Sequence, residues 1–195
     1  MNDTPAYARS PELMTPEDTV LVVVDVQEKL MPLIAAGRRI IWNLRRLLDG
    51  AEATGLKVLA TEQYPQGLGP TVHELASRLG EIPSKTAFSC LGCEPFAERL
   101  GQSGASKVMV AGIEAHVCVQ QTALDLRTMD YDVFVCADAV GSRGRIDYEY
   151  ALHRMRQAGV LVTTVESVLF ELCNRCDTDR FKGMLEVIKA HSPAD

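Results

Sequence analysis

Short apolar runs rich in β-branched residues recur along the chain, and longer stretches with helical spacing separate them. The runs are Val20–Asp25, Lys57–Thr61, Lys107–Ala111, Asp132–Ala137 and Val160–Val165. None of them alternates strictly between apolar and polar positions, which is typical of strands buried on both faces of a parallel sheet. The runs therefore predict the strands of one buried sheet.

The intervening stretches place apolar residues three and four positions apart, as amphipathic helices do. These stripes cover residues 40–51, 119–127 and 150–158, and Phe181–Lys189 predicts a further amphipathic helix near the C-terminal end. Strands that alternate with helices predict an α/β fold, here a three-layer α/β/α sandwich with a six-stranded, mostly parallel sheet. We expect residues 1–17 to form an N-terminal arm and residues 18–195 a single domain that includes the C-terminal helix.

Composition narrows the classes of function. The chain has 195 residues, 47% of them apolar and 24% charged, as in ordinary globular proteins. Its net charge of −6 argues against a protein specialised for nucleic acid or membrane surfaces. No apolar run approaches the roughly 20 residues of a membrane span, and the polar N-terminal stretch lacks the pattern of a secretory signal. We therefore expect a cytoplasmic protein that binds neither nucleic acid nor membranes.

The cysteines leave several interpretations open. Four of the six form two C-x-x-C pairs, Cys90 with Cys93 and Cys173 with Cys176. Four thiolates could complete a tetrahedral zinc site, either pair could form a disulfide, and Cys90 with Cys93 could form a redox couple. The long separation of the two pairs is unlike the roughly 15–20 residues of compact zinc ribbons, and small buried thiols account for the residues equally well.

Two charged residues stand at positions where ligands gather in open parallel sheets, near the carboxyl ends of the strands. Asp25 closes the first predicted strand, where an isolated carboxylate is costly to bury unless it has a partner or a task. It could equally cap the segment that follows. Lys85 lies in a short segment among apolar neighbours, and alone it is compatible with an ordinary surface lysine.

Cys118 stands between the predicted strand Lys107–Ala111 and the helix that VCVQQTALDL opens. A thiol at a helix N-terminus meets unsatisfied N–H groups and the positive end of the helix dipole, which favour the thiolate. The same N–H groups could hold an oxyanion. A buried structural cysteine is the alternative.

Taken together, these segments resemble the isochorismatase-like cysteine hydrolases, a superfamily that includes nicotinamidases and N-carbamoylsarcosine amidase. The matching pieces are LVVVDVQ, PSKTAFS, VAGIEAHVCVQQTALDL, DVFVCADAVGSR and HRMRQAGVLVTTVES, in the order of the family and over roughly residues 18–170. The stretch Gly-x-x-x-x-x-Cys-Val-x-x-Thr-Ala is the most specific. TEQYPQGLGPTVHEL and the C-terminal tail are similar to the isochorismatase-domain-containing branch, some members of which carry a ribonuclease label.

The resemblance implies a catalytic triad, with Asp25 as general base, Cys118 as nucleophile and Lys85 as the cationic member. It also implies an oxyanion hole made by the backbone N–H groups of Glu114 and Cys118, a cis peptide at Ile113–Glu114, and a homo-oligomer. A thiol with an ordinary pKa of about 8.5 is mostly protonated at neutral pH, so a base and a cation beside it both serve the attack.

Two departures from relatives limit the reaction. Nicotinamidases carry an Asp-x-His metal motif where this chain reads TEQYP (residues 61–65), so the resemblance implies no metal and no cofactor. True isochorismatases cleave a vinyl ether without a nucleophilic cysteine, so Cys118 counts against that reaction. We expect a metal-independent cysteine hydrolase of a small amide-like substrate. The expected pocket walls are Gln27, Tyr64, Phe88 and His116.

A different class of function stays open. A non-catalytic binding or scaffold protein could retain the same fold and the same residues as a ligand pocket. The ribonuclease label of some relatives has no basic tract in this sequence to support it.

Overall fold

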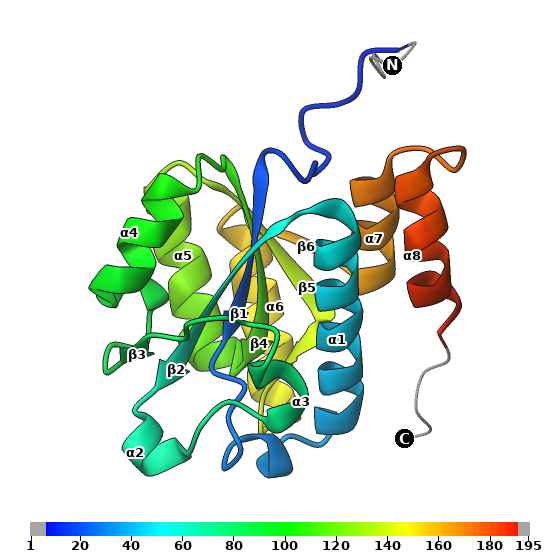
Figure 1. Cartoon of the computed structure of the whole chain (residues 1–195). Coiled ribbons are helices and arrows are strands. Elements are labelled where there is room, and N and C mark those ends of the chain that lie inside the picture. Colours follow the sequence, from blue (N-terminus) through cyan, green and yellow to red (C-terminus); the bar gives the residue numbers. More distant parts are fainter. Residues whose placement is uncertain (1–6, 191–195) are drawn as a thin grey trace.

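Six parallel strands form the centre of the protein, in the order β3-β2-β1-β4-β5-β6 (Figure 1). In chain order they are β1 (Thr19–Val24), β2 (Lys57–Gln63), β3 (Ser84–Lys85), β4 (Lys107–Ile113), β5 (Asp132–Gly141) and β6 (Leu161–Thr163). The computed structural model describes residues 7–190. Five strands lie where the apolar runs predict them. The short β3 leaves no pattern in the sequence, because two residues cannot show a period.

Helices cover both faces of the sheet, which confirms the predicted three-layer sandwich (Figure 1). One face carries α1 (Gly37–Thr54), α7 (Val165–Cys173) and α8 (Asp179–Lys189), and the other carries α4 (Glu94–Gln102), α5 (Gln120–Thr128) and α6 (Arg145–Gln157). Shorter elements lie between them: η1 (Met31–Leu33), α2 (Pro65–Leu68), α3 (His73–Ala76), η2 (Cys90–Gly92) and the π-helical turn η3 (Ala115–Val119). Within the described residues, no helix is long and apolar enough to span a membrane.

The central strand β1 explains why the apolar runs do not alternate. Leu21 and Val23 pack into the core beneath α1, whereas Val20, Val22 and Val24 pack into the core beneath α4 and α5. Successive side chains of a strand point to opposite faces, so a strand with a core on each side must be apolar at every position.

The segment before β1 is fastened to the amino ends of the strands. Met14 is completely buried, and its backbone N–H donates to the Glu171 carboxylate at 3.1 Å. Lys107, at the start of β4, donates to the carbonyl of Leu13 at 3.0 Å and pairs with Asp18 at 2.6 Å. The division between an arm and a domain at residue 18 stays a prediction, and its residues 1–6 lie outside the described part of the chain.

Strand β5 is longer than its sequence predicts, because it bulges against β4. Val110 pairs with Val135 and Gly112 with Val140, so β5 advances five residues while β4 advances two. The bulge interrupts the register of β5 with β4 over residues 136–139, where the carbonyl of Asp138 accepts from Asn43 of α1 at 2.7 Å.

Gly112 allows β4 to pass close to β1 at the carboxyl edge of the sheet. Its φ of +115° suits glycine alone, and a Cβ there would lie 2.2 Å from the carbonyl oxygen of Val24. This close approach brings the chain that leaves β4 next to the end of β1.

We expect Gly112→Ala to lower the free energy of unfolding by at least about 2 kcal/mol, because both the backbone angle and the space exclude a methyl group. Urea denaturation followed by circular dichroism measures the loss. Gly101→Ala in α4 is the matched control, since a Cβ there meets no atom within 4 Å. Its stability should be unchanged or higher by up to about 1 kcal/mol. Equal midpoints for the two variants would contradict this account of Gly112.

Candidate active site

The three residues of the expected triad come from three different strands and meet at the carboxyl edge of the sheet. Asp25 directly follows β1, Lys85 ends β3, and Cys118 lies in η3 just after β4. From β1 the chain proceeds outward to β2 and β3, and it then returns to the other side of β1 for β4, β5 and β6. The edge between β1 and β4 is therefore the switch point at which open α/β sheets bind ligands.

Asp25 is fully buried, and its carboxylate is held on both oxygens. Oδ2 accepts from Lys85 Nζ at 2.7 Å, and Oδ1 accepts from the Thr61 hydroxyl at 2.8 Å. The residue has a left-handed φ of 51°, which aspartate tolerates better than most residues. Burial raises the pKa of Asp25, and the bonds from Lys85 only partly offset this rise. The carboxylate is consequently a stronger base than an ordinary aspartate.

Lys85 is also buried, and oxygens surround its ammonium group. Besides Asp25, Nζ donates to Gln63 Oε1 at 2.7 Å and to the carbonyls of Phe88 and Ala87 at 2.9 and 3.2 Å. Burial is the largest single influence and opposes the charge, but Asp25, with smaller contributions from Cys118 and Cys90, raises the pKa of Lys85 overall. Lys85 is therefore a cation at neutral pH.

Cys118 is 6% exposed, and its Sγ lies 4.0 Å from Gln63 Oε1. The expected helix start is instead the π-helical turn η3, and α5 begins only at Gln120. Burial and the charge of Asp25 raise the pKa of the Cys118 thiol, and Lys85 offsets only part of this effect. The expectation that a helix N-terminus favours the thiolate is therefore not met, because burial and Asp25 dominate. The resting residue is a thiol beside a base.

Sequence reasoning missed two polar residues and a second thiol around the triad. Gln63 contacts both Lys85 and Cys118, and its Nε2 donates to the carbonyl of Thr86 at 2.9 Å. The Thr61 hydroxyl bridges Asp25 to Cys90 Sγ, which is 3.3 Å from it. Burial and Asp25 raise the pKa of Cys90 to about 11, so it too is a thiol. The only available signal was position, since Thr61 and Gln63 stand near the end of β2.

The turn that carries Cys118 is fastened to the segment after β5. The Ile113–Glu114 peptide is cis, as the resemblance implies. The buried Glu114 carboxylate accepts from the backbone N–H and Nε of Arg143, both at 3.0 Å. His116 Nδ1 lies 2.9 Å from Ser142 Oγ. The oxyanion-hole role of the Glu114 and Cys118 N–H groups stays a prediction.

The four expected pocket walls differ in exposure. Tyr64 and Phe88 are 55% and 52% exposed, and His116 is half-buried beside Ser142. Gln27 is completely buried, and its amide binds backbone only. Oε1 accepts from Gln63 N at 2.8 Å, and Nε2 donates to the carbonyls of Gln63 and Gly69. A substrate contact stays a prediction for all four residues.

No group of three or more metal-ligating side chains occurs in the part of the chain that the structure describes. All six cysteines are free thiols, Cys176 being the exposed one. In the stretch that aligns with the nicotinamidase metal motif, Thr61 and Gln63 are both bonded to the triad.

An isochorismatase domain model matches residues 19–167. The chain belongs to the isochorismatase family. Isochorismatase domain-containing protein 1 of Salmo salar is 40% identical over 183 residues, which make up 92% of this chain and 64% of that protein. The chain thus spans less than two thirds of the length of this relative and of its Danio rerio counterpart.

Solved structures of family members share the fold. The MAR1 ribonuclease of Caenorhabditis elegans is 38% identical, with a TM-score of 0.87 over 93% of this chain and 95% of that one. YcaC of Pseudomonas aeruginosa, solved with hexane-2,5-diol and covalent acrylamide, is 25% identical, with a TM-score of 0.84 over 93% of this chain and 94% of that one. The octameric YcaC of Escherichia coli, a hydrolase of unknown specificity, gives the same score and identity and covers 93% of each chain. Membership of this hydrolase family supports a hydrolase function.

We expect Asp25→Asn to lower the pKa of the Cys118 thiol, because the substitution removes a negative charge that disfavours the thiolate. The midpoint of the pH profile for alkylation of Cys118 by iodoacetamide, followed by peptide mass spectrometry, should move to lower pH. A fall of one pKa unit raises the thiolate fraction of Cys118 about ten-fold at a pH below both midpoints.

Asp18→Asn is the matched control for this experiment. Asp18 also pairs with a lysine, Lys107, but it precedes β1 at the opposite end of the strand from Asp25. The alkylation profile of this variant should follow that of the wild type. An unchanged or higher midpoint in Asp25→Asn would mean that Asp25 does not set the acidity of Cys118.

Proposed function

We propose that the protein is a metal-independent cysteine hydrolase that cleaves the C–N bond of a small amide-like substrate through a thioester. The observation that carries the proposal is the buried ion pair of Asp25 and Lys85, 2.7 Å apart, beside the thiol of Cys118. A carboxylate whose pKa burial has raised is a suitable acceptor for a thiol proton.

In the first half-reaction, Cys118 Sγ attacks the amide carbonyl carbon while its proton passes to Asp25. Because the thiol pKa is raised, the proton leaves during the attack and no thiolate accumulates beforehand. The N–H groups of Glu114 and Cys118 stabilise the tetrahedral oxyanion. Protonated Asp25 then donates its proton to the leaving nitrogen, so that the C–N bond breaks, the amine departs and a thioester remains.

In the second half-reaction, Asp25 accepts a proton from water, whose oxygen attacks the thioester carbonyl. The C–S bond breaks, the sulfur regains a proton from Asp25, and a carboxylic acid leaves. Lys85 stays protonated throughout, since its Nζ is held by Asp25, Gln63 and two carbonyls. It keeps Asp25 oriented and balances the charge that develops on the sulfur.

The comparisons support the chemistry at one further point. YcaC of Pseudomonas aeruginosa carries covalent acrylamide, an unsaturated amide. Acrylamide adds to nucleophiles through its double bond, so the adduct supports a reactive nucleophile in that relative and says nothing of cleavage of the amide bond. We assign Tyr64 and Phe88 to the walls of the entrance and Gln27 to the support of Gln63.

We expect Cys118→Ala to lower hydrolysis of any amide substrate by at least about a thousand-fold, because no other group replaces the nucleophile. A panel of primary amides and anilides is assayed for released ammonia or amine, and acid-quenched wild type is searched by mass spectrometry for an acyl group on Cys118. Cys176→Ala is the control, since this cysteine is exposed and should be dispensable.

Two other results would point elsewhere. Wild-type protein that binds panel members but releases no product would favour the binding or scaffold alternative.

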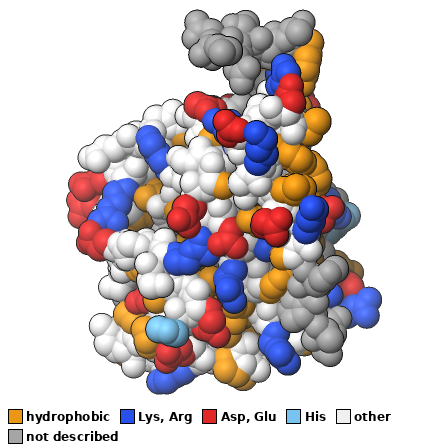
Figure 2. Space-filling model, turned by 45° about the vertical axis from the view of Figure 1, so that its right-hand side comes forward, with side chains coloured by type: hydrophobic (Ala, Val, Ile, Leu, Met, Phe, Trp, Pro, Cys, Tyr) orange, Lys and Arg blue, Asp and Glu red, His pale blue; other side chains and the backbone are white. Residues whose placement is uncertain are grey.

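The same panel includes a single-stranded RNA oligonucleotide, because MAR1 of Caenorhabditis elegans is named a ribonuclease. On the face formed by α1, α7 and α8, basic and acidic side chains are interspersed and form no broad basic tract (Figure 2). Cleavage of RNA that Cys118→Ala retains would exclude the thiol mechanism for that activity.

The relatives also suggest an assembly. YcaC of Escherichia coli is octameric, and we propose that this protein is a homo-oligomer to which the C-terminal segment contributes. Sedimentation velocity should give a multiple of the monomer mass. A monomer at micromolar concentration would contradict the proposal.

The cytoplasmic location stays a prediction.

A further inference from the structure

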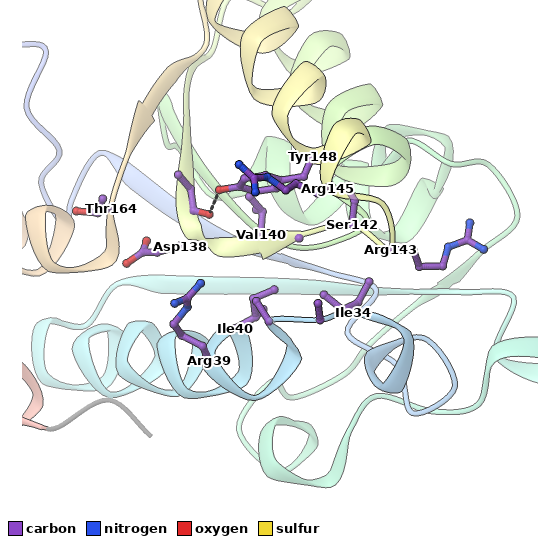
Figure 3. Close-up of a pocket in the computed structure, with 14 residues that line it drawn as sticks. Ile34, Arg39, Ile40, Asp138, Val140, Ser142, Arg143, Arg145, Tyr148 and Thr164 are labelled. Carbon is purple, nitrogen blue, oxygen red and sulfur yellow. Dashed lines mark hydrogen bonds between the residues drawn. The ribbon is translucent and has the colours of Figure 1, made fainter. Parts of the chain in front are cut away.

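A cavity lies at the carboxyl end of β5, next to the strand β4 that leads to Cys118 (Figure 3). Its volume is about 490 Å³, within the range of small-molecule sites. The N-terminal part of α1 forms one wall, and the bulged end of β5 with the start of α6 forms the other. The triad residues are not among those that line it.

The lining combines an apolar interior with basic side chains. Ile34, Ile40 and Val140 supply apolar surface between the two walls, and Arg143 and Arg145 stand on the α6 side (Figure 3). A ligand that fits this combination has a flat apolar body and a negatively charged group.

Arg145 is the basic side chain on the α6 side that can receive an anion, because the Arg143 side chain extends away from the cavity (Figure 3). Glu149 accepts from Nε of Arg145 at 2.7 Å, and among the described contacts none occupies the outer guanidinium nitrogens of Arg145. Asp138, the acidic residue of the lining, stands at the end near Thr164 (Figure 3). Its Oδ1 accepts from the backbone N–H of Val165 at 2.9 Å. Arg39 rises from α1 toward the same end (Figure 3). The lining thus carries three arginines and one acidic residue, which favours an anionic ligand.

We propose that this cavity is a second binding site for a small carboxylate with an apolar or aromatic body, and that its occupancy changes the reactivity of Cys118. The connection is direct. Arg143 binds the carboxylate of Glu114 and Ser142 binds the ring of His116, and both partners belong to the turn that carries the thiol. A ligand in the cavity lies against Ser142 and Arg143 and shifts the contacts that these two residues make with the turn.

The coupling rests on the proposed function, because that reaction releases a carboxylic acid and a site for such acids would make the enzyme sensitive to its product class. The binding itself does not depend on turnover. Benzoate is a suitable probe, with benzyl alcohol as a neutral probe of the same size.

Titration of the protein with benzoate, followed by NMR of the backbone amide signals, tests binding to the cavity. We expect saturable binding of benzoate, with shifts centred on residues 34–40 and 137–145, and at least ten-fold weaker binding of benzyl alcohol. Ala36→Phe, which fills the cavity from the α1 side, should abolish benzoate binding. Arg145→Ala should weaken it at least three-fold and Arg145→Lys should largely restore it.

Arg154→Ala is the matched control, because this arginine is exposed on the same helix and does not line the cavity. It should bind benzoate as the wild type does. Absence of saturable binding, or equal affinities in wild type and Ala36→Phe, would overturn the site.

Alkylation of Cys118 tests whether occupancy of the cavity changes the reactivity of the thiol. Saturating benzoate should change the iodoacetamide rate at Cys118 at least two-fold in wild type and leave it unchanged in Ala36→Phe. Equal rates with and without benzoate in wild type would overturn the coupling, and a change that persists in Ala36→Phe would place benzoate at the triad instead. Neither readout uses hydrolysis, so loss of the proposed activity and loss of this site are distinguishable results.

Discussion

The structure of the site depends on one interaction, the buried ion pair between Lys85 and Asp25. Both side chains are excluded from solvent, and burial of two charges is costly unless further bonds complete their coordination. Thr61, Gln63 and the carbonyl of Phe88 supply those bonds. Asp25 follows β1, Thr61 and Gln63 lie in β2, and Lys85 ends β3. The ion pair therefore requires the carboxyl ends of these three strands to stay in register.

The same burial favours the protonated form of Cys118, the proposed nucleophile. Many reactive cysteines are thiolates at rest, and such thiolates are readily oxidised or alkylated. Here burial and Asp25 raise the pKa of Cys118, and a second thiol, Cys90, is protonated as well. In the proposed mechanism, the sulfur therefore becomes nucleophilic only as Asp25 takes its proton, when a suitable electrophile lies beside it.

The sequence predicts the layers well because β1 and its neighbours are buried on both faces and therefore apolar at every position. Asp25 and Cys118 are recognisable from their places next to strand ends, whereas Lys85 stands out only through the family resemblance, since β3 is too short to be seen. Gln63 was missed because an uncharged amide carries no signal of its own, and its role arises from the spatial meeting of β2 and β3. The bulge of β5 also escaped prediction, because register is a property of two strands together.

The Gln27 side chain joins the two ends of the loop between Gln63 and Gly69. Its single amide group binds the backbone at Gln63, where the loop leaves β2, and at Gly69, where the loop ends. The residues between Gln63 and Gly69, including the exposed Tyr64, are therefore anchored at both ends by the Gln27 side chain. The ends of this loop are thus anchored independently of its interior residues. Under the proposed function, exchange of residues 64–68 for those of another family member should change the choice of substrate and leave the contacts of Gln63 with Lys85 and Cys118 in place.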